Sequence, residues 1–303
     1  MKEIGEELIN LDEDNKPSKK EEIKKRNNNK SSIYIFLFSI IIIIFSIIIL
    51  YSYLNKKMNL QKQKKSLIIF DFDKTITETD TFEEQINLLD SPEEREDLFR
   101  RIYEESWGFV MAEAYIRFHE LNFTISDINK YIDSVQITSG MKELFNFLYN
   151  QKDKYILAIF SAGNLYQVNR VLQTNNLTSF FDEIIAFNSY EKDGKIIVEK
   201  RKGNFTCDMC SYIGFCKNHE FNLLKSKYEQ KNIYFEKVYF ICDGVNDYCL
   251  ARNLAKSDEL LIRKKFDLDN YLYKEGYIKN IKCNINKWNN GFDIINFFKK
   301  GNN

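Results

Sequence analysis

Histidine is scarce in this sequence, with only His119 and His219 among 303 residues. Mechanisms that depend on a histidine base, and metal sites built from several histidines, are therefore disfavoured. Neither sign of charge is in excess, because 44 basic residues balance 44 acidic ones. That balance argues against a general polyanion-binding surface, and we expect no nucleic acid partner.

The first 65 residues lack the features of a globular domain. Residues 1–31 are polar and charged, which predicts a disordered tail. Residues 33–53 contain no charge at all, and about 20 such residues can cross a bilayer as a helix. We expect residues 32–54 to be a transmembrane helix that contacts the lipid bilayer, because the apolar core of the alternative, a cleaved signal peptide, would be shorter and nearer the start.

Basic residues flank this apolar run on both sides. Six precede it and five follow it, so the charges favour neither orientation across the membrane. Residues 55–65 form a basic linker, which could contact anionic headgroups or serve as a solvated spacer.

The stretch Ser66 to Thr77, SLIIFDFDKTIT, organises the rest of the chain. Its short apolar run predicts a buried parallel strand, with Asp71 and Asp73 emerging at the carboxyl end, where open α/β sheets bind ligands. Two acids spaced by two residues can point the same way and hold a cation between them. They could also simply cap a turn together with Thr75, and the motif alone does not separate these interpretations.

A helical region follows. Residues 82–150 are charged and show no strand-like alternation, and most of them exceed what a crossover connection needs. We expect a small helical cap over about residues 80–140, followed by a helix that packs on the sheet through a stripe of apolar residues, namely Met141, Leu144, Phe145 and Leu148.

Two further buried strands end in polar residues. Residues 155–160 are followed by Ser161, Ala162 and Gly163, where free N–H groups at the next helix start would make a phosphate cradle, although Ser161 could be an ordinary N-cap. Residues 238–241 are followed by Asp243 and Asp247, which add the oxygen ligands that Mg²⁺ requires.

The remaining segments complete an α/β pattern. Residues 181–199 read as a strand, a turn and a strand, residues 260–262 and 278–285 as strands, and residues 292–298 as a closing helix.

Three cysteines cluster before a lysine. Cys207, Cys210 and Cys216 could be free, disulfide-bonded or bound to zinc, but a fourth ligand is not evident. Lys217 follows at a helix start, against the helix-dipole preference, which suggests a positional role; it could also be a surface lysine.

The ordered motifs Asp71-x-Asp73-x-Thr75, Ser161, Lys217 and Asp243-Gly-Val-Asn-Asp247 resemble those of the haloacid dehalogenase (HAD) superfamily of phosphohydrolases. Within it, the cysteine-rich run before Lys217 is similar to the phosphoethanolamine/phosphocholine phosphatase family and its pyridoxal-phosphate phosphatase relatives. The resemblance implies an α/β fold for residues 66–303, a Rossmann-like three-layer core with a parallel sheet and a helical cap. Ala162 stands where the family usually has an acid, so the substrate stays open.

The resemblance also implies a mechanism. Asp71 would attack phosphorus, Asp73 would act as general acid and base, and Lys217 would neutralise charge, with Mg²⁺ held by Asp71, Asp73, Asp243 and Asp247. The remaining predicted substrate contacts are Thr75, Ser161, Ala162 and Gly163. The expected activity is hydrolysis of a small phosphorylated metabolite. The alternatives are a membrane-anchored phosphatase for phosphoproteins or lipid headgroups, and a non-catalytic scaffold.

Overall fold

The computed structural model describes residues 36–53, 63–89, 91–101, 105–199, 207–210 and 214–301. The predicted disordered tail lies outside these residues, as do residues 32–35 and 54 of the predicted span and residues 55–62 of the predicted linker. The described residues fall into two units, divided between Gln61 and Lys62, and each unit is considered by itself.

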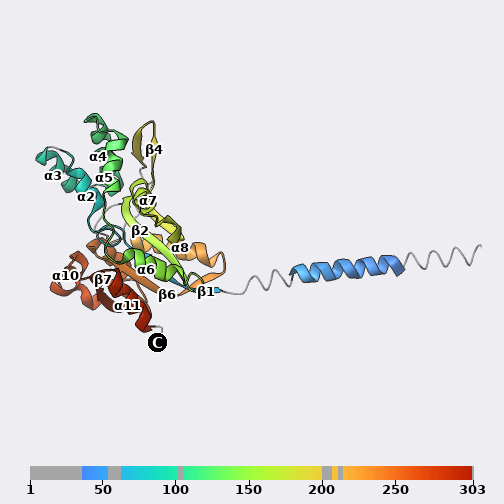
Figure 1. The fold of residues 1–303 in the computed structure, drawn as a ribbon. Coiled ribbons are helices and arrows are strands. Elements are labelled where there is room, and N and C mark those ends of the chain that lie inside the picture. The colour runs from blue at the N-terminus through green and yellow to red at the C-terminus, as the bar shows by residue number, and fades with distance from the viewer. Residues whose placement is uncertain are drawn as a thin grey trace, which may run out of the picture. The chain divides into compact units, whose positions relative to one another are not determined.

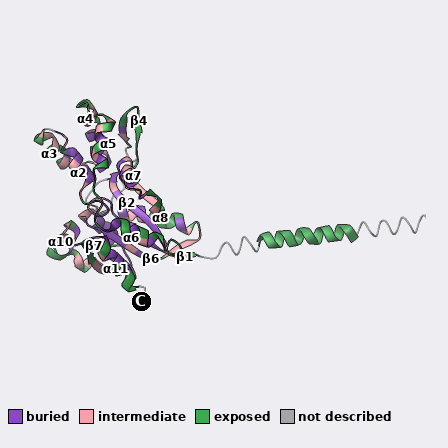
Figure 2. Ribbon diagram, in the orientation of Figure 1, coloured by how far each residue is buried: buried purple, intermediate pink, exposed green. Residues whose placement is uncertain are grey.

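The first unit contains one long helix, Phe36–Tyr53. Its 18 residues have a mean hydropathy of 2.6, and its apolar side chains are exposed along its whole length (Figure 2). By length and composition this helix could cross a membrane.

The second unit is built on a six-stranded parallel sheet in the order β3-β2-β1-β6-β7-β8 (Figure 1). The strands are β1 (Gln63–Phe70), β2 (Tyr155–Asn164), β3 (Glu183–Phe187), β6 (Ile233–Cys242), β7 (Glu259–Arg263) and β8 (Asn284–Trp288). The predicted α/β fold with a parallel sheet is confirmed.

Helices cover both faces of this sheet, because alternate residues of β1 point to opposite sides. Ile68 and Phe70 belong to one apolar cluster, and Leu67 and Ile69 belong to another. The first cluster includes residues of α6 (Met141–Tyr149), α7 (Leu165–Thr174) and α11 (Gly291–Gly301), and it extends into the helices between β1 and α6. The second cluster includes residues of α8 (Lys217–Glu229), α9 (Tyr248–Ala251) and α10 (Asp267–Lys274). The result is a three-layer core.

A group of short elements lies at one end of the sheet, at the top of Figure 1. Between β1 and α6 the chain forms α2 (Thr81–Ile86), α3 (Pro92–Arg101), α4 (Trp107–Glu120) and α5 (Ile125–Asp133). They occupy the stretch for which the sequence predicts a helical cap. An antiparallel hairpin, β4 (Ser189–Lys192) and β5 (Lys195–Val198), packs against α4.

Three predictions about the strands are wrong in part. Residues 63–65 belong to β1 and pair with β6, so the basic linker does not extend to residue 65. These residues can join the strand because the pairing uses backbone hydrogen bonds and needs no apolar side chains. Residues 181–199 contain three strands, since β3 joins the main sheet. Residues 278–285 do not form one strand: a 3₁₀ turn, Tyr277–Asn280, precedes β8, and Ile278 and Ile281 pack on the second cluster instead.

Candidate active site

The parallel register brings the predicted site residues to one edge of the sheet. Phe70 of β1 lies beside Ile159 of β2 on one side and Ile241 of β6 on the other. Residues that follow these positions on the three strands therefore emerge together. The predicted convergence of Asp71 and Asp243 is confirmed by their shared pocket.

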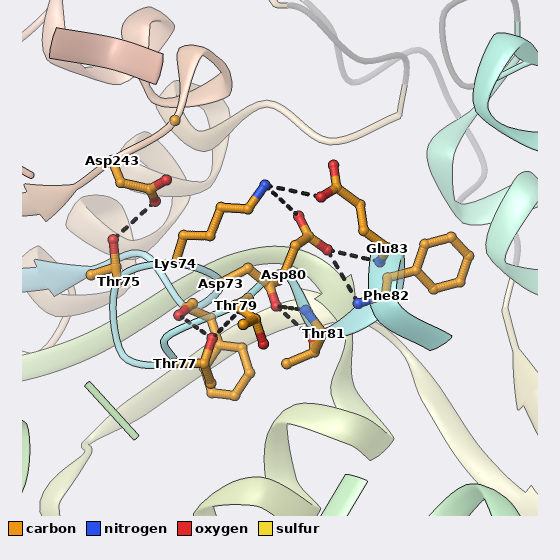
Figure 3. A network of polar contacts seen from close by, with 12 residues as sticks. Asp73, Lys74, Thr75, Thr77, Thr79, Asp80, Thr81, Phe82, Glu83 and Asp243 are labelled. Atoms are coloured by element: carbon orange, nitrogen blue, oxygen red, sulfur yellow. Dashed lines mark hydrogen bonds and ion pairs between the residues drawn. The ribbon is translucent and has the colours of Figure 1, made fainter. Parts of the chain in front are cut away.

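A tight turn after β1 orders the first motif. The Phe72 carbonyl accepts hydrogen bonds from the N–H groups of residues 75, 76 and 77. Lys74 takes a left-handed conformation with φ of 54°, which is uncommon for a residue with a side chain. This turn brings the Thr75 hydroxyl within 3.0 Å of Asp243 Oδ1, to which it donates a hydrogen bond (Figure 3). Thr75 thus orients a carboxylate from a neighbouring strand.

Three carboxylates form a buried cluster. One oxygen each from Asp71, Asp243 and Asp247 lies within 4.8 Å of the others, and all three residues are buried. Burial raises the pKa of Asp71 to about 7, and the Asp247 carboxylate adds to this shift while Lys217 opposes it. Burial together with Asp71 and Asp247 raises the pKa of Asp243 as well. Such a cluster of oxygens needs positive charge to stay ionised.

Lys217 supplies part of that charge. Its side chain is 1% exposed, and its Nζ lies 2.6 Å from Asp71 Oδ1 and also contacts Asp247 Oδ1. Burial alone would lower the lysine pKa, but the carboxylates of Asp247 and Asp71 outweigh it and raise the pKa. Lys217 is the first residue of α8, as predicted, and it is not a surface lysine.

Asp73 has different surroundings from Asp71. Its Oδ1 accepts hydrogen bonds from the Thr81 N–H at 2.9 Å and the Thr81 hydroxyl at 2.5 Å (Figure 3). Burial raises the pKa of Asp73 to about 6, although the bonds from Thr81 oppose this. The other oxygen, Oδ2, lies 3.5 Å from the position that a Cβ on Gly163 would take. A Cβ at position 163 would be in ordinary contact with this carboxylate but would crowd the Ser161 hydroxyl, at 3.0 Å.

A pocket of about 370 Å³ opens over these residues. Aromatic rings of Phe82, Phe99 and Trp107 form part of its wall, and the Phe82 and Trp107 rings meet edge to face at 5.0 Å. Five of the predicted site residues line it: Asp71, Asp73, Ala162, Gly163 and Asp243. The other four predicted residues, Thr75, Ser161, Lys217 and Asp247, are buried behind the wall.

The predicted phosphate cradle differs from the structure. The Gly163 N–H donates to Ser161 Oγ at 2.9 Å, and the Gln167 N–H donates to the Asn164 side chain at 2.9 Å. These donors are satisfied within the protein, so they are not free for a ligand. Ser161 is neither an N-cap nor a pocket residue, because β2 continues to Asn164, which caps α7.

Several residues in and around the pocket were not predicted from the sequence. Thr81, which holds Asp73, and Trp107 both belong to the helical region. Asp80 also lines the pocket and is the N-cap of α2, and its carboxyl pKa is raised to about 7 by burial and by Asp73. The one sequence signal was the capping pattern Asp80-Thr-Phe-Glu, which marks a helix start but carries no information about Asp73.

The comparison with protein families decides the identity. The family model described as Putative Phosphatase matches residues 66–300. The chain belongs to this family. It is a phosphatase of the HAD superfamily, as its motifs predict.

Relatives of this HAD phosphatase carry phosphatase names. Human pyridoxal phosphate phosphatase PHOSPHO2 is 28% identical over 239 residues, which cover 76% of this chain and 96% of the human protein. The bovine protein of the same name is 26% identical, with 78% and 98% covered. Chicken phosphoethanolamine/phosphocholine phosphatase is 21% identical, with 70% and 78% covered.

Solved structures support the fold of the phosphatase. A phosphoserine phosphohydrolase-like protein from Francisella tularensis aligns with a TM-score of 0.51 at 20% identity, covering 77% of this chain and 99% of that one. An apo phosphoserine phosphatase aligns with a TM-score of 0.50 at 18% identity, covering 77% and 98%. At these identities the likeness concerns the fold alone.

Proposed function

We propose that this phosphatase hydrolyses a small phosphomonoester with the help of Mg²⁺, through a phosphorylated Asp71. The observation that carries the proposal is that three carboxylates line one pocket, from Asp71, Asp73 and Asp243. The Asp247 carboxylate and the Lys217 ammonium are buried directly against this group.

The carboxylate cluster fits a magnesium ion. Mg²⁺ prefers oxygen ligands and is usually held by one or two carboxylates together with substrate phosphate. Asp71, Asp243 and Asp247 place oxygens together, and Lys217 alone leaves this buried group with excess negative charge. The backbone carbonyl of Asp73 would complete the protein ligands. When bound, the ion would neutralise phosphate oxygens and so allow a dianionic ester to approach a carboxylate.

Asp71 is the proposed nucleophile. Its Oδ1 accepts hydrogen bonds from the Phe72 N–H at 2.7 Å and from Lys217, which fixes the carboxylate and leaves Oδ2 as the attacking oxygen. Oδ2 forms a bond to phosphorus while the bond between phosphorus and the ester oxygen breaks, giving an aspartyl phosphate. Little covalent chemistry is required beyond this, because phosphoryl transfer depends mostly on positioning and charge neutralisation.

Asp73 is the proposed acid and base. With a pKa of about 6, it can hold a proton near neutral pH and give it to the leaving alkoxide. The resulting carboxylate then takes a proton from a water molecule, whose oxygen attacks the aspartyl phosphate. Inorganic phosphate leaves, and both aspartates return to their starting states. Thr81 positions Asp73 through Oδ1, so Oδ2 is the oxygen that exchanges the proton.

The substrate we favour is a planar aromatic phosphomonoester such as pyridoxal phosphate. Phe82, Phe99 and Trp107 line the pocket, where aromatic contact with such a group would be favourable. Phosphocholine and phosphoethanolamine are the runner-up class, since the pocket acids Asp80 and Glu83 could meet an amine, although Lys74 already pairs with both. The relatives' names span the same two classes.

A substrate panel tests this proposal. The full chain in detergent would be assayed for Mg²⁺-dependent phosphate release from pyridoxal phosphate, phosphoethanolamine, phosphocholine, a phosphopeptide and a phosphorylated lipid in vesicles. We expect pyridoxal phosphate to give the highest kcat/KM. Trp107→Ala should raise its KM about tenfold through lost ring contact, whereas Tyr149→Ala, an exposed tyrosine of α6, should not. Preference for the phosphopeptide or the lipid would reject the small-metabolite assignment.

The buried acids predict a pH-dependent stability. The pKa values of Asp71 and Asp73 are raised by burial to about 7 and about 6, so between pH 5 and 7 the unfolded chain has released protons that the folded chain still holds. Stability of the metal-free chain should therefore fall as pH rises through this window, by about 3–4 kcal/mol or roughly 6–16 °C in melting temperature. The measurement is thermal unfolding followed by fluorescence.

Magnesium should reverse this loss. We expect Mg²⁺ to raise the melting temperature more at pH 7 than at pH 5, because it binds the ionised cluster. Asp243→Asn should remove most of this response, whereas Asp153→Asn, an exposed acid before β2, should keep it. Equal Mg²⁺ effects at both pH values would argue against metal binding by these carboxylates.

We also propose that residues 32–54 anchor the phosphatase in a lipid bilayer. The exposed apolar helix Phe36–Tyr53 supports this. Full-length chain expressed in cells should sediment with membranes and resist alkaline extraction, and a variant with four leucine-to-lysine or isoleucine-to-lysine changes in this helix should not. Release of the unaltered chain by alkali would contradict the anchor.

A further inference from the structure

We propose that this chain binds a structural zinc ion through four cysteines, Cys207, Cys210, Cys216 and Cys249. The proposed hydrolysis does not use these side chains. Their sulfur atoms all lie within 4.8 Å of one another, and all four cysteines are free thiols in the structure. The sequence shows the first three as a cluster. The fourth, Cys249, follows β6 in the chain, and the fold brings it to the other three.

The spacing of the sulfurs suits one tetrahedral ion. Zinc–sulfur bonds of about 2.3 Å place the four sulfurs of a tetrahedral site roughly 3.8 Å apart. The Cys207 and Cys210 sulfurs are 3.4 Å apart, and the other pairs fall within 4.8 Å. A multi-iron cluster would need cysteines further apart, because iron and sulfide ions lie between them. Four thiolates without oxygen or imidazole ligands favour zinc over magnesium.

The surroundings of the sulfurs suit thiolates. The Cys207 N–H donates to Cys210 Sγ at 3.5 Å, and the His219 N–H donates to Cys216 Sγ at 3.4 Å. Cys216 is the N-cap of α8, where the helix dipole stabilises negative charge. Cys216 and Cys249 are 2% and 1% exposed, so half of the site is shielded from solvent. Metal-binding sulfurs are characteristically supported by such donors.

The position of the cluster gives the ion a role. Cys216 immediately precedes Lys217, and Cys249 follows Asp247 by two residues. Lys217 Nζ in turn contacts Asp247 Oδ1. One ion bound to both cysteines would join the start of α8 to the start of α9, and so fix the distance between the ammonium and the carboxylates. The four cysteines are positioning residues in this assignment, because none lines the pocket.

Two other states of the four cysteines, disulfides and free thiols, can be distinguished chemically from zinc binding. Two disulfides would remove four hydrogens from the chain, and four free thiols would react with a thiol reagent once exposed. Zinc binding instead releases protons from the thiols without oxidation. A thiol reagent that modifies the thiolates would then release the zinc into solution.

The metal content of the full chain tests the proposal directly. The full chain would be purified in detergent without added metal and dialysed against a moderate chelator. Elemental mass spectrometry should then find one zinc ion per chain. The zinc content of the Cys249→Ala and Cys210→Ala variants should fall to near zero. Cys283→Ala, which alters a buried cysteine outside the cluster, should keep its zinc.

A cobalt measurement keeps the test independent of the folding of variants. Unaltered chain loaded with Co²⁺ should show the strong visible bands and thiolate charge-transfer absorption of a tetrahedral tetrathiolate. Absence of zinc with four reactive thiols, a mass showing two disulfides, or full zinc retention by Cys249→Ala would each overturn the proposal. None of these readouts uses phosphatase activity, so a failure of the zinc site is distinguishable from a failure of the proposed hydrolysis.

Discussion

The Asp71→Asn variant should lose phosphatase activity by at least roughly 10⁴-fold in kcat, because the amide cannot attack phosphorus. The fold should persist, since asparagine has the same shape and its amide oxygen can still accept the Phe72 N–H and the Lys217 ammonium. Initial rates of phosphate release at saturating substrate and Mg²⁺, together with the far-ultraviolet circular dichroism spectrum, would measure both effects.

Asp153→Asn is the matched control for this loss. It makes the same chemical change at an exposed aspartate before β2, far along the strand from the pocket. We expect it to keep activity within about twofold, as surface substitutions usually do little. If Asp71→Asn kept a substantial share of the activity with an intact fold, Asp71 would not be the nucleophile.

The Lys217→Met variant should lose both activity and stability. Methionine fills similar space but leaves the buried carboxylates of Asp71 and Asp247 without their ammonium. Breaking a buried ion pair by removing one partner costs about 3–5 kcal/mol, which corresponds to roughly 6–20 °C in melting temperature. The measurement is thermal unfolding at pH 7 without Mg²⁺, followed by an activity assay with Mg²⁺ at low temperature.

Lys227→Met provides a control on the same helix. Lys227 also lies on α8, and its ammonium pairs with Glu183 at 2.7 Å, but its side chain is 49% exposed. Surface ion pairs contribute about 0–1 kcal/mol, so this variant should be close to the unaltered chain. If the two substitutions changed melting temperature and activity equally, the ion pairs of Lys217 with Asp71 and Asp247 would contribute no more than the exposed pair of Lys227.

Local sequence patterns predicted the parts of this molecule that depend on neighbours along the chain. Apolar runs ending in acids identified the ends of β1 and β6, and the apolar stripe of α6 identified a helix packed on the sheet. Because parallel strands end at the same edge, the pattern also predicted that Asp71 and Asp243 would share a pocket.

Contacts between distant segments were less accessible to prediction. Nothing near Cys249 in the sequence marks it as a partner of Cys216, since they meet only because α8 and α9 cover the same face of the sheet. Thr81 similarly reaches Asp73 only after the turn at Lys74 has reversed the chain. The start of β1 was missed because Lys64 and Lys65 carry no apolar signal and join the sheet by backbone pairing.

Trapping the covalent intermediate tests the central proposal most directly. Full chain with Mg²⁺ would be mixed with pyridoxal phosphate, quenched in acid within a turnover, and treated with borohydride, which reduces an aspartyl phosphate to homoserine. Peptide mass spectrometry should then find homoserine at position 71, and only when substrate and Mg²⁺ were both present. Homoserine at Asp73 or Asp243, or none at any position despite turnover, would contradict an attack by Asp71 on phosphorus.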